Sequence, residues 1–236
     1  MTPPNESLNT PLPRHPGGQL ATRPLHFIWI ADCSGSMSGS KITALNFAIR
    51  EAIPAMRKVA DENPNAKVLL RALRFSSNVQ WHVAQPTPLE SFTWTDLSTD
   101  GVTNMGRAMS MVADVLKVPP MEERALPPVL VLISDGQPSD DFNSGLKKLL
   151  AEKWGQKAVR IAIAIGDDAD TEVLKRFINN PEILPLQANN ADDLVNYIKW
   201  ASTAVLQSVS SPTAQTSSST GPALAVPKPA QSTNVW

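Results

Sequence analysis

Three near-continuous apolar runs constrain the fold of this chain more than any other feature. They lie at 25–31 (LHFIWIA), 128–134 (PVLVLIS) and 158–165 (AVRIAIAI). A short apolar run without polar alternation is typical of a β-strand that is buried on both faces, as in a parallel sheet covered by helices. We therefore expect these runs to form the centre of such a sheet.

Segments of other types separate and follow these runs. Apolar residues recur every three or four positions, as on one face of an amphipathic helix, over 42–56, 105–116, 142–154, 173–178 and 194–205. The stretch 67–83 is typical of two strands around a turn at 76–78, and 183–188 is typical of a last strand. Alternating buried strands and helices predict an α/β fold with a largely parallel central sheet and helices on both faces.

The composition changes near both ends of the chain. Residues 1–24 contain six prolines and only three charged residues, and residues 208–236 are rich in Ser, Thr and Pro with one charged residue, Lys228. Such tracts bury too little apolar surface to offset the loss of chain entropy on folding. We therefore expect one domain over 25–207 between disordered tails at 1–24 and 208–236.

Charge and cysteine content exclude several classes of protein. The 21 basic and 22 acidic residues give a net charge of −1, which argues against binding nucleic acid or anionic membranes through bulk charge. The single cysteine, Cys33, excludes an intramolecular disulfide and a cysteine-based zinc cluster. No apolar run approaches the roughly 18 residues of a membrane span, and the first residues lack the apolar block of a secretory signal. We expect a cytoplasmic protein.

Candidate functional residues follow the predicted strands. In open α/β sheets, ligands bind beyond the carboxyl ends of the strands. The loop after the first apolar run reads DCSGS, the loop after the second begins SDG, and a threonine lies just before the helix predicted at 105–116. Together these loops bring two carboxylates and three hydroxyls to one edge of the sheet: Asp32, Ser34, Ser36, Thr103 and Asp135.

Five oxygen donors of this kind predict a divalent-cation site. Hard oxygen ligands suit Mg²⁺ or Mn²⁺ rather than zinc or copper. Two carboxylates match the charge of the ion, and neutral hydroxyls leave it electrophilic with an exchangeable coordination position. Such a site is suited to capturing an incoming carboxylate.

The same residues resemble a known family. D-x-S-x-S after a first apolar strand, a downstream threonine and an Asp-Gly after a later strand resemble the von Willebrand factor A domain over about 25–207, and the five residues match its metal-ion-dependent adhesion site. The stretches KITALNFAIREAIPAM, LISDGQPSDD and AIAIGDDAD are more closely similar to the TerY-type A domains linked to tellurium resistance.

This resemblance implies a fold and a function. It implies a Rossmann-like sheet of about six strands with one antiparallel edge strand, and metal-dependent protein binding without catalysis. TerY-type proteins are associated with a PP2C-type, metal-dependent protein phosphatase and a protein kinase. The resemblance therefore implies an adaptor in a bacterial stress or phosphorylation signalling system.

Other roles for the polar residues remain open. Serines and aspartates at strand ends also cap helices or form Asx turns. Asp140 and Asp141 precede the helix predicted from Phe142 and are better candidates for its N-cap than for ligands. The acidic residues of 167–170 are candidates for capping the helix that follows them. We expect Cys33 to be a buried small apolar residue rather than a nucleophile.

Two other functions also remain open. A metal-dependent phosphoryl hydrolase would use Asp32, but Ser34 stands where a second carboxylate of that loop would lie, and the histidines of the domain lie in no recognisable motif. A metal-independent scaffold would use the same edge without an ion. Measuring divalent-ion binding separates the scaffold from the adhesion site, and a phosphatase or ATPase assay separates the enzyme.

Overall fold

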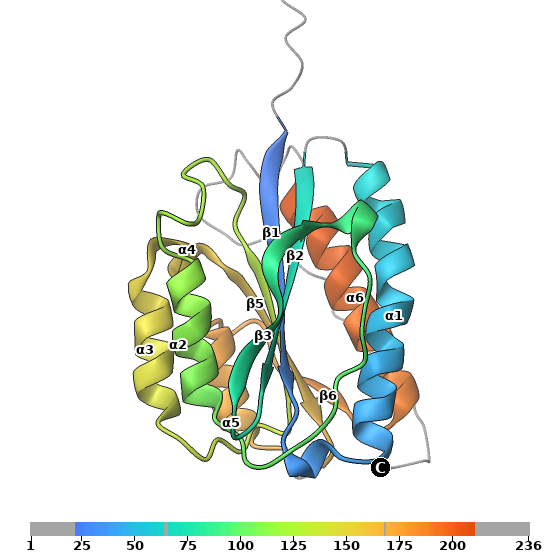
Figure 1. Ribbon diagram of the computed structural model, residues 1–236, viewed down its shortest axis with the longest axis vertical. Coiled ribbons are helices and arrows are strands. Elements are labelled where there is room, and N and C mark those ends of the chain that lie inside the picture. The colour runs from blue at the N-terminus through green and yellow to red at the C-terminus, as the bar shows by residue number, and fades with distance from the viewer. Residues whose placement is uncertain (1–21, 64–65, 168, 211–236) are drawn as a thin grey trace, which may run out of the picture.

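The computed structural model describes residues 22–63, 66–167 and 169–210. A six-stranded sheet with the strand order β3-β2-β1-β4-β5-β6 forms its centre (Figure 1). The neighbouring strands are parallel except for β2 and β3, which are antiparallel, so the predicted mostly parallel sheet is confirmed. The strands are β1 (Arg23–Asp32), β2 (Ala66–Phe75), β3 (Val79–Pro88), β4 (Val129–Ser134), β5 (Val159–Ile165) and β6 (Leu186–Ala188).

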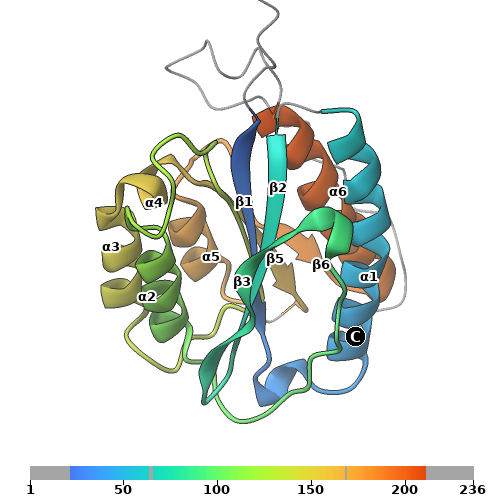
Figure 2. The same cartoon turned by 45° about the horizontal axis from the view of Figure 1, so that its top comes forward.

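Helices cover both faces of the sheet, as Figures 1 and 2 show. One face carries α1 (Ser40–Asp61) and α6 (Ala191–Ser210). The other face carries α2 (Met105–Val115), α3 (Phe142–Ala151), α4 (Lys153–Lys157) and α5 (Thr171–Ile178). Two short 3₁₀ helices, η1 (Gly35–Met37) and η2 (Leu89–Ser91), lie in the loops after β1 and β3. The predicted three-layer α/β architecture is therefore confirmed.

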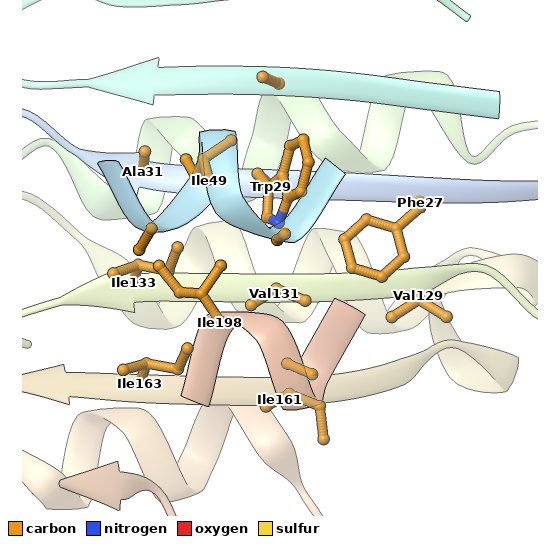
Figure 3. Close-up of a cluster of buried hydrophobic side chains, with 14 of the residues drawn as sticks. Phe27, Trp29, Ala31, Ile49, Val129, Val131, Ile133, Ile161, Ile163 and Ile198 are labelled. Atoms are coloured by element: carbon orange, nitrogen blue, oxygen red, sulfur yellow. The ribbon is translucent and has the colours of Figure 1, made fainter. Parts of the chain in front are cut away.

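The burial of both sheet faces explains the continuous apolar runs. In β1, Phe27 and Trp29 point to the core under α1 and α6, whereas Ile28 and Ile30 point to the core under the other helices. Because each face is covered, alternate residues of the strand are both buried. Figure 3 shows the first core, in which side chains of β1, β4 and β5 pack beneath Ile49 of α1 and Ile198 of α6.

Two predicted elements differ from the observed ones. The helix predicted over 142–154 is divided, because Glu152 adopts an extended conformation (φ −78°, ψ 138°) between α3 and α4. The strand predicted at 183–188 pairs only over Leu186–Ala188. Pro185, the residue before this strand, has no N–H group to donate to a ladder.

The first strand and the last helix extend slightly beyond the predicted limits of the domain. β1 begins at Arg23 and α6 ends at Ser210, so the predicted limits at 25 and 207 fall inside these two elements. The tails predicted at 1–24 and 208–236 lie largely outside the described residues. No helix in the described part of the chain is long and apolar enough to cross a membrane.

The connections of the sheet place a topological switch point at its carboxyl edge. β1 lies between β2 and β4. The chain passes from β1 to α1 on one face, and from β4 to α3 on the opposite face. Loops that leave neighbouring parallel strands toward opposite faces open a crevice between them, and this is where open α/β sheets bind ligands. The predicted site residues of the loops after β1 and β4 lie at this point.

Candidate metal site

Asp32, the last residue of β1, is fully buried at the carboxyl edge of the sheet. Its Oδ1 accepts a hydrogen bond from the backbone N–H of Ser34 at 2.8 Å, which is the Asx-type turn expected where a strand ends in aspartate. Its Oδ2 accepts a hydrogen bond from the hydroxyl of Ser134, the last residue of β4, at 2.5 Å. The loop after β1 and the end of the neighbouring strand β4 therefore fix the orientation of the Asp32 carboxylate.

The two serines of the first loop connect Asp32 to Asp135. The hydroxyl of Ser36 donates a hydrogen bond to Oδ2 of Asp135, and it lies 3.0 Å from the hydroxyl of Ser34. Ser34 and Asp135 are buried, whereas Ser36 is exposed. Four of the five predicted site residues thus form one hydrogen-bonded cluster that joins the loops after β1 and β4.

Thr103, the fifth predicted residue, lies at the same edge but is held differently. Its loop meets the first loop where the backbone N–H of Gly35 donates to the carbonyl of Gly101 at 2.9 Å. The backbone N–H of Thr103 donates to the hydroxyl of Ser139 at 2.9 Å. Within the described residues, no hydrogen bond joins the Thr103 hydroxyl to the other four predicted ligands.

No basic side chain among the described residues balances the negative charge of the cluster. Burial raises the pKa of Asp32 to about 6, and the neighbouring charge of Asp135 acts in the same direction, against the hydrogen bonds from Ser134 and Ser34. Across the described part of the chain, no basic side chain forms an ion pair with either carboxylate. Arg74, at the end of β2, pairs instead with Asp100 at 3.8 Å.

This donor set fits a divalent cation. All of its polar atoms are oxygens, which suits Mg²⁺ or Mn²⁺. Among the described residues, no three His, Cys, Asp or Glu side chains lie close enough together to hold a metal. A site at this edge would therefore depend on two carboxylates supplemented by hydroxyls and water.

The neighbouring acidic residues cap helices. Asp141 accepts a hydrogen bond from the backbone N–H of Ser144 and caps α3, as predicted. Asp170 caps α5 in the same way, and Asp168 lies outside the described residues. Asp140 also acts as a cap, but it caps α2 rather than the predicted α3, because its carboxylate reaches the first turn of the neighbouring helix.

Cys33 anchors the first loop through its backbone. Its N–H donates to the carbonyl of Phe75, and its carbonyl accepts from the N–H of Asp100, both at 2.8 Å. The side chain is fully buried, and burial raises the pKa of its thiol to about 12, so the thiol stays protonated. The expectation of a buried residue is confirmed.

Both described histidines are engaged outside the cluster. Nε2 of His26 lies 2.8 Å from a carboxylate oxygen of Glu122, and Nε2 of His82 lies 2.8 Å from the carbonyl oxygen of Thr95. Neither histidine contacts a predicted ligand.

Sequence reasoning missed two serines that support the site. Ser134 orients Asp32, and Ser139 binds the backbone of Thr103. The sequence pattern gave no signal for Ser134, because a serine at the end of a strand is equally typical of a turn. Both residues lie in the same LISDGQPSDD stretch as Asp135.

The fold and the site together define a doubly wound α/β domain with a candidate divalent-cation site at its switch point. A model of the von Willebrand factor type A domain matches residues 28–199, and the chain belongs to this family. A search of curated protein sequences finds no significant match.

Solved structures of low sequence identity share the fold. A von Willebrand factor type A protein from Catenulispora acidiphila is 15% identical with a TM-score of 0.60, and the match covers 80% of this chain and 43% of that one. The ArnB paralog VWA2 from Sulfolobus acidocaldarius is 18% identical, with a TM-score of 0.56 and coverage of 76% and 45%. This chain thus matches less than half the length of either protein.

A third similar structure carries a metal. Proximal thread matrix protein 1 from the mussel byssus, solved with a zinc-occupied MIDAS motif, is 14% identical with a TM-score of 0.57. The match covers 80% of this chain and 48% of that one. At such identities the likeness shows the shared fold alone.

Proposed function

We propose that this protein is a metal-ion-dependent protein-binding module. The observation that carries the proposal is the pair of buried carboxylates, Asp32 and Asp135, which two neighbouring strands bring together with hydroxyl donors and without a cationic partner among the described residues. Two acidic groups in such surroundings are strongly stabilised by a divalent cation. The zinc-occupied MIDAS motif of the mussel protein supports a metal at this place in the fold.

Five residues would hold the ion, Mg²⁺ or Mn²⁺: Asp32, Ser34, Ser36, Thr103 and Asp135. The bound ion would supply a positive charge that accepts a carboxylate from a partner protein. The chain itself contributes two charged ligands and neutral hydroxyls, so the charge of the ion is incompletely quenched. A partner aspartate or glutamate, partly dehydrated at the interface, would gain strongly from this charge and act as a hot spot.

Metal titration tests the site. Asp32→Ala and Asp135→Ala each remove one of two charged ligands and are expected to reduce Mn²⁺ binding sharply in titration calorimetry. Ser34→Ala and Ser36→Ala should weaken it less, because water replaces a neutral hydroxyl. Asp114→Ala is the matched control, since this exposed carboxylate lies on α2 and pairs with Lys117 and Lys148. Unchanged Mn²⁺ binding by Asp32→Ala would refute the site.

We further propose that the partners belong to a phosphorylation system of the TerY type, a PP2C-type phosphatase and a protein kinase. The support is the resemblance of three stretches, among them LISDGQPSDD, to TerY-type domains. The test is a pull-down from native lysate with the full chain, with and without EDTA. Recovery of such a phosphatase or kinase only in the chelator-free sample supports the proposal. If the recovered partner binds equally well in EDTA, a metal-independent scaffold replaces it.

We propose that the protein is not an enzyme. The cluster has two carboxylates, and the described histidines bind Glu122 and Thr95 elsewhere, so the described residues supply no general base to the cluster other than the predicted ligands. A metal-dependent phosphoryl hydrolase is the alternative. Mg²⁺-dependent turnover of a phosphomonoester that is lost in Asp32→Ala would establish the enzyme instead.

A further inference from the structure

The first turn of α2, which begins two residues after Thr103, has no cap of its own. Its N-cap residue, Asn104, makes no capping bond, and its side-chain amide donates instead to the carbonyl of Ser77 at 2.8 Å. The carboxylate of Asp140 takes the place of the cap: it accepts from the N–H of Gly106 at 2.7 Å and from the N–H of Arg107 at 2.8 Å. These are the N–H groups that a helix cap normally satisfies.

Ser139, the residue before Asp140, holds the backbone of Thr103 on both sides. Its hydroxyl accepts from the Thr103 N–H at 2.9 Å, and its own N–H donates to the Thr103 carbonyl at 2.8 Å. These paired bonds fix the peptide groups on both sides of the Thr103 Cα. The direction of the Thr103 side chain is therefore set by the segment that follows β4.

The helices behind these contacts are in close backbone contact. A Cβ added to Gly106 of α2 would overlap the carbonyl of Asp141, and a Cβ added to Gly145 of α3 would overlap the carbonyl of Gly106. The contact leaves no room for a side chain between the first turns of α2 and α3. Because α2 and α3 pack this closely, the hydrogen bonds of Ser139 and Asp140 join two segments whose relative position is fixed.

We propose that Ser139 and Asp140 are positioning residues for Thr103, so that the segment after β4 supplies one ligand, Asp135, and places another. This inference rests on the proposed metal site and deepens it. Residues that hydrogen-bond to metal ligands and orient them commonly contribute to the affinity for the metal although they do not touch the ion. The inference distinguishes Asp140 from its neighbour Asp141, which caps a helix that carries no ligand.

The experiment compares neighbouring variants of the full chain with Mn²⁺ alone as the probe. Ser139→Ala and Asp140→Ala are expected to weaken Mn²⁺ binding about tenfold in titration calorimetry. Ser139→Thr retains the hydroxyl at an exposed position and should bind as the wild type does. Asp141→Ala, which also loses a helix cap, should lower the melting temperature in EDTA but leave Mn²⁺ affinity unchanged.

A second measurement follows the Thr103 loop directly in EDTA. Hydrogen exchange of the Thr103 amide should accelerate in Ser139→Ala, and exchange of the Gly106 and Arg107 amides should accelerate in Asp140→Ala. Asp141→Ala should accelerate exchange only in the first turn of α3. This readout separates displacement of the Thr103 loop from a general loss of stability.

The outcomes separate the inference from the function on which it rests. Mn²⁺ binding by the wild type that is unchanged in Ser139→Ala and Asp140→Ala overturns the inference and leaves the metal site in place. Equal weakening in Asp140→Ala and Asp141→Ala also overturns it, because the effect is then one of capping alone. Absence of Mn²⁺ binding by the wild type overturns both.

Discussion

The buried carboxylate of Asp32 predicts a measurable pH dependence of folding in the metal-free protein. Burial beside Asp135 raises its pKa from 3.8 to about 6. In the pH window between these two values, the folded protein retains a proton that the unfolded chain has released. The free energy of unfolding therefore falls as the pH rises through this window, by about 3 kcal/mol in total from this one group.

The variant Asp32→Asn isolates this contribution. Asparagine keeps the shape of the side chain and does not titrate, so any cost from the altered bonds to Ser34 and Ser134 is independent of pH. In urea unfolding with EDTA, the stability of Asp32→Asn relative to the wild type should rise by about 3 kcal/mol between pH 3.5 and pH 7. A difference that stays constant over this range would refute the reasoning, since it would show that folding does not penalise the charged carboxylate.

Two controls accompany this measurement: the removal of an exposed carboxylate and the addition of Mg²⁺. Hydrogen bonds from Lys117 and Lys148 lower the pKa of Asp114, so removing that group by Asp114→Asn should change the pH slope in the reverse direction. Mg²⁺ added at pH 7 should stabilise the wild type, by about 2.7 kcal/mol at a hundred times its dissociation constant. The same addition should leave Asp32→Asn nearly unchanged.

Three further predictions concern the framework around the site. Gly106→Ala should destabilise the domain by about 1–3 kcal/mol in urea unfolding despite the better helix propensity of alanine, because its Cβ overlaps the Asp141 carbonyl. Trp29→Ala should cost about 3–5 kcal/mol in the same assay, because the side chain is fully buried among aromatic rings. Burial lowers the pKa of His26 despite its bond to Glu122, so the stability of the wild type relative to His26→Gln should fall as the pH drops below 6.5, which melts of the two proteins at a series of pH values would measure.

Sequence periodicity was sufficient for the layers of the fold but not for the ends of its elements. The apolar runs of β1, β4 and β5 are continuous because both faces of the sheet are covered, and this pattern is visible without a structure. The break after α3 is not visible, because Glu152 adopts its extended conformation within a segment whose apolar spacing continues to Trp154. Periodicity records which side chains are buried, whereas a helix end depends on the backbone conformation of single residues.

The candidate site was predictable to the extent that its residues follow strands. Asp32 and Asp135 come directly after two apolar runs, and parallel pairing of β1 with β4 brings them together. The role of Asp140 was not predictable in the same way. Its place in the sequence, just before α3, indicates a cap for that helix, and only the packing of α2 against α3 assigns its carboxylate to α2.

The exposure of the cluster residues indicates which of them could hold an ion and which could contact a partner. Asp32 and Asp135 are nearly inaccessible, whereas Ser36 is exposed. The carboxylates would therefore act on a partner through the charge of a bound ion rather than by touching it. Contacts that select such a partner would then come from exposed residues around the cluster, such as Val102, which precedes Thr103 and is 52% exposed. Under the proposed function, the ion would supply a general attraction for carboxylates, and surrounding residues of this kind would decide which partner binds.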